Sequence, residues 1–316
     1  MDVETEQAVR TAIEQAAGKS RLFPAERLDR LGWDELLAAD TESAVRILFE
    51  EKGRRLLVSP ALDSVVHNAL AGPWQWAAAP IVYPRPGSVT VLTDDGTRLD
   101  GLLLADPAQG AEQLLAPLPS GDGARLAALP VAGITATPVS GIDDSLELWR
   151  VTAARDRATE LREGNDWDAG LSAARRALAH ETIGLSRRMM HIVVEHVRAR
   201  EQFGRPLGAN QAVQHRLADA EVDLSCAEAI AEESWAAGTS LAAVAAKGAA
   251  DRAFETIARH GQQLLGAIGY TWEHQWHHHL RRGLFLSALL GAADECERDV
   301  GRSLVQSGVV RMGRLR

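Results

Sequence analysis

The chain has 316 residues, 46% of them hydrophobic, which is enough to bury the core of one or two compact domains. Its formal net charge of −9 argues against a nucleic-acid partner, because such a partner requires a basic surface. No leader-like apolar stretch opens the sequence and no apolar run reaches the roughly 18 residues of a membrane span, so we expect a soluble, cytoplasmic protein with no membrane partner.

The first segment, residues 1–75, has the patterns of a helical region. Residues 41–57, TESAVRILFEEKGRRLL, place apolar side chains at helical spacing. Thr41 or Ser43 is the expected N-cap of this helix. Pro60 is placed to begin the next helix, since proline is favoured in a first helical turn.

The second segment, residues 76–155, has the patterns of short strands. Residues 88–105, SVTVLTDDGTRLDGLLLA, alternate apolar and polar side chains on either side of Asp95-Gly96, which predicts a β-hairpin. Further short apolar runs occupy residues 127–139 and 146–153, and Gly, Pro and Asp separate them. We therefore predict a small antiparallel β-domain.

The third segment, residues 156–316, is rich in Ala and again helical. Three long helices are predicted at residues 168–200, 210–238 and 240–269. Long helices joined by short turns favour an antiparallel four-helix bundle, and small Ala side chains allow the helices to approach closely. The predicted fold class is α+β: helices, then a small sheet domain, then a bundle.

Two spaced motifs in the third segment resemble one family. Residues 200–211, REQFGRPLGANQ, resemble the R-x-x-F-G-x-x-x-x-x-x-Q signature of the flavin-dependent acyl-CoA dehydrogenases. Residues 262–274, QQLLGAIGYTWEH, resemble that family's Q-x-x-G-G-x-G-y-T segment, with Ala267 where the family usually has Gly. The resemblance implies an acyl-CoA dehydrogenase-like fold with a reduced N-terminal helical region, and an acyl-CoA substrate.

In that family the two segments hold the adenosine and pyrophosphate end of FAD in the neighbouring subunit. Each residue type suits this work: Arg200 can fork onto phosphate oxygens, Phe203 can stack on adenine, and Gly266 lets the backbone approach the pyrophosphate. Either segment alone would also fit a solvated Arg at a helix end, a core Phe and a C-cap Gly. The resemblance predicts these cofactor-binding residues: Arg200, Gln202, Phe203, Gln211, Gln263, Gly266 and Ala267.

The carboxylate base of the family is not found at either of its two known positions. The family reaction removes the α-proton of an acyl-CoA thioester with a carboxylate while the β-hydrogen leaves as hydride to the flavin. The alignment places Leu290 at one base position and Ala174 at the other. The sheet segment also lacks the family's flavin-contacting Q-x-x-x-T-E…G-S-D sequence. We therefore predict no catalytic residue in this chain.

This pattern resembles the short, base-less subunits of actinobacterial heteromeric acyl-CoA dehydrogenases, which act on steroid-derived CoA esters. The resemblance implies a full-length catalytic partner in an α2β2 assembly. The alternative is a self-sufficient homo-oligomer that uses Glu181 or Glu273 as a displaced base. We expect Glu181 instead to face another helix as a structural carboxylate, and Glu273 to begin a helix. His274 and His278 lie one turn apart, but no third ligand is evident, so we predict no metal site.

Overall fold

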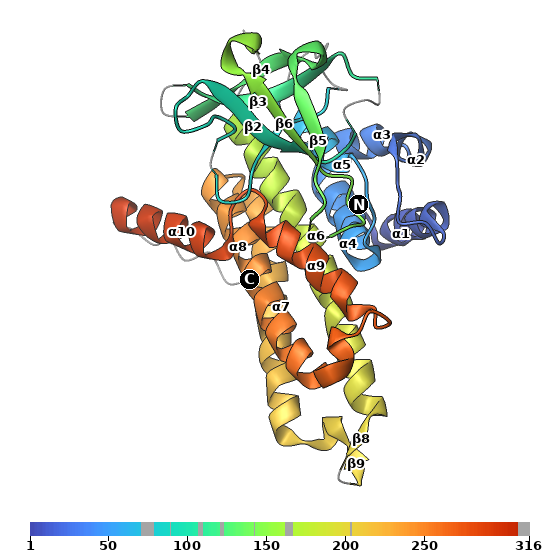
Figure 1. Cartoon of the computed structure of the whole chain (residues 1–316). Helices are drawn as coiled ribbons and strands as arrows, with labels where there is room; N and C mark the ends of the chain where they lie inside the picture. Colours follow the sequence, from blue (N-terminus) through green and yellow to red (C-terminus); the bar gives the residue numbers. More distant parts are fainter. Residues whose placement is uncertain are drawn as a thin grey trace.

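The computed structural model describes residues 1–70, 79–88, 90–106, 110–120, 123–141, 143–161, 167–202 and 204–308. Figure 1 shows sheets at one end of the molecule, long helices running away from them, and the N-terminal helices beside the junction. This is the predicted order of helices, small antiparallel sheets and helical bundle. Within the described ranges, no helix is long and apolar enough to cross a membrane.

Among the described residues, five helices precede the sheets: α1 (Val3–Ala17), α2 (Ala25–Leu31), α3 (Trp33–Ala39), α4 (Thr41–Arg55) and α5 (Ala61–Ala69). Neither of the two predicted N-caps of α4, Thr41 and Ser43, is correct. Asp40 is the cap, because it lies outside the helical region and its carboxylate accepts from the Ser43 amide at 3.0 Å. Thr41 is already helical, and its hydroxyl donates to the Leu37 carbonyl. Pro60 directly precedes α5.

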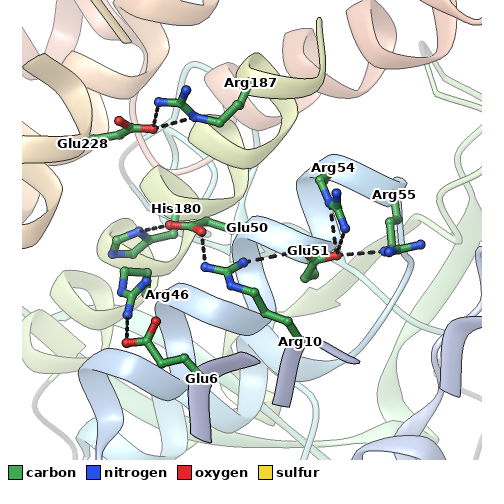
Figure 2. A network of polar contacts seen from close by, with 10 residues as sticks. All are labelled: Glu6, Arg10, Arg46, Glu50, Glu51, Arg54, Arg55, His180, Arg187 and Glu228. Carbon is green, nitrogen blue, oxygen red and sulfur yellow. Dashed lines mark hydrogen bonds and ion pairs between the residues drawn. The ribbon is translucent and has the colours of Figure 1, made fainter. Parts of the chain in front are cut away.

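Ion pairs join α1 to α4, and a contact of Glu50 with His180 joins α4 to the first bundle helix (Figure 2). Arg10 of α1 donates to Glu50 at 2.7 Å and to Glu51 at 3.4 Å. On its other side, Glu50 lies 3.8 Å from His180. Burial alone would raise the pKa of the Glu50 carboxyl, but the contacts with His180 and Arg10 outweigh it and lower that pKa. The N-terminal helices are thereby held against the bundle.

Two antiparallel sheets follow. The first contains β1 (Tyr83–Pro84), β2 (Arg98–Leu103), β6 (Trp149–Ala154) and β5 (Thr135–Pro138), in that spatial order; the second contains β3 (Gln113–Ser120), β4 (Gly123–Pro130) and β7 (Thr159–Glu160). The turn predicted at Asp95-Gly96 is confirmed: the Asp95 carboxylate accepts from the Thr97 amide, and Gly96 has φ +67°. On the N-terminal side of that turn, the described pairing is a single bridge from Leu92 to Leu99 rather than a strand.

The third segment contains α6 (Trp167–Ala199), α7 (Gln211–Ala237), α8 (Ser240–Leu265), α9 (Trp276–Ala288) and α10 (Ala293–Ser307). Three of its helices match the predicted ones, except that α8 ends at Leu265 instead of near residue 269. Gly266, at φ +61°, breaks the helix, and Gly266–Tyr270 form the 3-10 turn η4. The boundaries near residues 75 and 155 remain predictions, although β7 lies beyond the second of them.

The closest approach between α4 and α6 depends on glycine. A Cβ on Gly53 would lie 1.9 Å from the Glu181 carbonyl oxygen, and one on Gly184 would lie 2.1 Å from the Glu50 carbonyl oxygen. The two backbones therefore touch, and no larger residue fits at either position. This contact brings the last turns of α4 against the middle of α6, beside the buried charges described below.

Candidate cofactor-binding site

The first predicted segment is a short hairpin between α6 and α7. Strand β8 (Glu201–Gln202) pairs with β9 (Arg205–Pro206), and the 3-10 turn η3 (Leu207–Ala209) leads into α7. Arg200 joins the hairpin to α6 through its main chain: its amide donates to the His196 carbonyl, and its carbonyl accepts from the Leu207 amide, both at 2.8 Å. The hairpin is thus held by its backbone, and the side chains of Arg200 and Gln202 are exposed.

Two other predicted cofactor-binding residues, Gln211 and Phe203, belong to the same segment. Gln211 is the first residue of α7, where the Asn210 side chain caps the helix by accepting from the Ala212 amide at 3.0 Å. The Gln211 side chain is exposed and has no part in this cap. Phe203 lies outside the described residues.

The second predicted segment is the end of α8 and the turn η4. Gln263 and Ala267 are exposed there and Gly266 is half-buried, whereas the neighbouring Gln262 accepts from the Trp276 indole at 2.9 Å. Gly269 is closely packed, since a Cβ on it would lie 2.6 Å from the Gln262 side-chain nitrogen. The two adjacent glutamines therefore differ. Gln262 binds the Trp276 indole within the protein, whereas the side chain of Gln263 is exposed and can contact a ligand.

His196, in the last turn of α6, interacts electrostatically with one residue of each segment. Burial lowers the pKa of His196, and His274 and Arg200 lower it further. Figure 1 shows the β8–β9 hairpin at the end of the molecule farthest from the sheets. The structure thus brings Arg200, Gln202 and Gln211 to one end of the bundle.

Both positions aligned with the catalytic base lie in the hydrophobic core. Ala174 is fully buried on α6, and Leu290 is 7% exposed in the connection between α9 and α10. Leu290 has φ +60°, and its carbonyl accepts from the Arg175 guanidinium at 3.0 Å. Neither side chain can take up a proton. The chain therefore offers no proton acceptor at these two positions.

Glu181 is a structural carboxylate, as expected. It is buried, with Lys52 Nζ 3.0 Å from one of its oxygens and Arg282 Nη1 3.7 Å from the other. Arg282 also pairs with Asp143 at 2.6 Å and donates to the Leu57 carbonyl at 3.1 Å. Residues from α4, α6, α9 and the β5–β6 connection therefore meet in one buried ionic cluster: Lys52, Asp143, Glu181 and Arg282.

Glu273 does not begin a helix, which corrects the expectation. It is exposed three residues before α9, whose N-cap position is taken by Gln275. Nearby, His274 Nδ1 accepts from the Trp276 amide at 3.3 Å. Within the described ranges, no three His, Cys, Asp or Glu side chains gather as metal ligands would.

Sequence patterns missed the buried polar groups. Asp63 is half-buried; burial of its carboxyl raises its pKa to about 6, and the Tyr83 hydroxyl donates to it at 2.6 Å. Asp251 lies fully buried beside Lys247, and burial raises its pKa to about 7. A charged residue at an apolar position of a helical repeat indicates a buried charge, but this sequence signal does not identify the residue that it pairs with.

Comparison with known proteins identifies relatives of this chain. The family described as "Acyl-CoA dehydrogenase, C-terminal domain" matches residues 167–305, which include both predicted segments. The acyl-CoA dehydrogenase IpdE2 of Mycobacterium tuberculosis is 32% identical over 280 residues, which are 86% of this chain and 80% of that protein.

Two solved structures have the same fold. A Tcur3481-Tcur3483 steroid ACAD variant matches with TM-score 0.74 and 23% identity, over 96% of this chain and 99% of that one. The ChsE4-ChsE5 complex of Mycobacterium tuberculosis matches with TM-score 0.75 and 20% identity, over 97% and 98%. On the identity and coverage of IpdE2, this chain belongs to the acyl-CoA dehydrogenase family.

Proposed function

We propose that this chain is the non-catalytic subunit of a heteromeric, FAD-dependent acyl-CoA dehydrogenase and that it supplies cofactor contacts to a catalytic partner. One contrast carries the proposal. The described residues predicted to contact FAD are exposed or half-buried, whereas Ala174 and Leu290 occupy the base positions inside the core.

The exposed residues have chemistry suited to the adenosine and pyrophosphate end of FAD. The Arg200 guanidinium has no described ion-pair partner and can donate two parallel hydrogen bonds to phosphate oxygens. Gln202, Gln211 and Gln263 can each donate to and accept from pyrophosphate or ribose. Gly266 and Ala267 leave the backbone of η4 open to the phosphates, and Phe203 is proposed to stack on adenine. FAD, when bound, supplies the acceptor for the substrate hydride.

The α-proton then has to be taken by a carboxylate of the partner chain. The names of the structural neighbours support a paired assembly, since one is a complex of two different chains, and another is called a steroid ACAD. We accordingly propose a full-length catalytic partner in an α2β2 assembly, and a CoA thioester of a steroid-derived acid as the substrate.

The alternative, a self-sufficient homo-oligomer, rests on Glu273 alone. Glu181 is held by two cations in the core, whereas Glu273 is exposed within the second cofactor segment. The two functions differ in what the isolated chain can do.

Expression with and without the partner separates them. Expressed alone, the chain should purify colourless and inactive; co-expressed with a full-length acyl-CoA dehydrogenase chain that carries the base, it should form a complex containing FAD. Stoichiometric flavin absorbance together with acyl-CoA oxidation by the isolated chain would overturn the proposal and favour the homo-oligomer.

A further inference from the structure

A basic pocket contains none of the predicted cofactor-binding residues, although its lining residue Gln275 directly follows the second cofactor segment. It has a volume of about 300 Å³ and opens where the α1–α2 connection, the end of α4, α6 and the start of α9 meet. Although the whole chain has a net charge of −9, no carboxylate is among the described residues that line this pocket. Five cationic side chains line it: Lys19, Arg21, Arg54, Arg55 and Arg188.

Two of these cations have a structural explanation. Arg54 and Arg55 lie in the last turn of α4, where positive charge offsets the helix dipole. Figure 2 shows both guanidinium groups directed at Glu51, which they reach at 3.0 and 2.8 Å. Arg55 also pairs with Glu14 at 2.7 Å. These two residues are therefore largely neutralised by the protein itself.

The other three cations have no such explanation. Lys19 and Arg21 form no ion pair with any described residue, and neither lies within a helix. Arg188 has no described carboxylate partner: it donates to the Gln275 side-chain oxygen at 3.0 Å and to His191 Nδ1 at 3.1 Å. Three positive charges from two distant parts of the chain thus face one pocket without a described counter-charge.

The neighbouring histidine is consistent with a positive potential in this pocket. Burial lowers the pKa of His279 to about 4, and Arg188 and Arg21 contribute to this lowering. The imidazole therefore adds no charge of its own at neutral pH. Like charges gathered in this way repel one another unless an anion joins them, which favours a ligand with several negative charges.

We propose that this pocket binds a phosphate-bearing anion. Arginine forks match phosphate oxygens in geometry, and a flexible lysine ammonium adds a point charge. Inorganic phosphate, pyrophosphate and the phosphates of coenzyme A share this chemistry. The site shares no residue with the two cofactor segments, and neither this proposal nor its test requires the proposed subunit function to be correct.

Isothermal titration of the purified full chain with pyrophosphate tests the site. Lys19→Ala/Arg21→Ala removes two of the unpaired cations, and binding should weaken on the order of tenfold to a hundredfold for each charge-assisted hydrogen bond that the change removes. Arg30→Ala/Arg298→Ala removes the same charge from exposed positions elsewhere, and binding should be unchanged. Arg188→Gln is a second pocket variant, and circular dichroism checks that each variant is folded.

Two results would overturn the proposal: no binding heat from phosphate, pyrophosphate or coenzyme A at millimolar concentration, or equal weakening in the pocket and control variants. Comparing the probes identifies the source of the anion. Coenzyme A binding more tightly than pyrophosphate, with loss of that advantage for dephospho-coenzyme A, would assign the pocket to the coenzyme. Coenzyme A binding no more tightly than pyrophosphate would assign it to a free phosphate anion.

Discussion

Arg200→Ala separates cofactor binding from folding. The main-chain bonds of residue 200 to His196 and Leu207 survive the change, and the side chain that is removed is exposed and forms no described ion pair. The free energy of unfolding of the chain should therefore change by no more than about 0.5 kcal/mol. A charge-assisted hydrogen bond to phosphate is worth about 1.5–3 kcal/mol, so FAD affinity of the complex should fall roughly ten- to a hundredfold or more.

The assay is equilibrium dialysis of FAD against the complex of this chain with its catalytic partner, read by flavin absorbance. Arg205→Ala is the matched control, because Arg205 is an exposed cation in the same hairpin, paired across it with Gln202. FAD binding like wild type in Arg200→Ala would refute the assignment of this segment. An equal loss of FAD affinity in both variants would mean that Arg200 acts only through general electrostatic attraction.

Three further predictions follow from the buried groups and the close helix contact. Glu181→Gln leaves two buried cations without their shared carboxylate and should lower the free energy of unfolding by roughly 3–5 kcal/mol, measured in urea. Glu273→Gln changes an exposed side chain, so the stability of the chain should be little changed and the turnover of the complex should stay within about tenfold of wild type. A loss of turnover near the ~10²–10⁴ typical of a base would place the base in this chain. Burial raises the pKa of Asp63 from 3.8 to about 6, so the folded state binds this proton more tightly than the unfolded state. The free energy of unfolding should therefore fall by on the order of 3 kcal/mol as the pH rises from about 4 to 6. This pH dependence should be absent in Asp63→Asn, and an identical pH dependence in both proteins would contradict the prediction. Gly53→Ala should disrupt the contact of α4 with α6 and lower the melting temperature sharply. Gly301→Ala is the control: nothing lies within 4 Å of the new methyl group, and the change should stabilise α10 by about 0.5–1 kcal/mol. Similar melting temperatures for the two variants would refute the close contact.

The helices of the bundle were predictable because the signals that end them are local. Asn210 caps α7, Gly238 ends it, and Thr239 caps α8, all within a few residues of the helix that each one bounds. Helical periodicity and these caps can be read without knowing any tertiary contact. The end of α8 was placed too late because its apolar pattern continues into a 3-10 turn.

The buried ionic cluster was not predictable for the opposite reason. Lys52 and Glu181 are 129 positions apart, and Arg282 lies a further 101 positions along the chain. Periodicity indicates that such residues are on a buried face, but only the fold determines which charges meet. The role of Glu181 was therefore open between base and structural group until its partners were placed. The FAD contacts remain predictions because, in the proposal, they form with a neighbouring subunit.

The backbone-held hairpin at Arg200 also affects how this surface can change over evolutionary time. Main-chain bonds hold the turn, and they do not depend on which side chains it carries. Substitutions there can alter what the surface recognises at little cost to folding, provided that glycine is kept where φ is positive, at Gly204. A cofactor contact on such a turn can be acquired, altered or removed by single mutations while the bundle behind it stays intact.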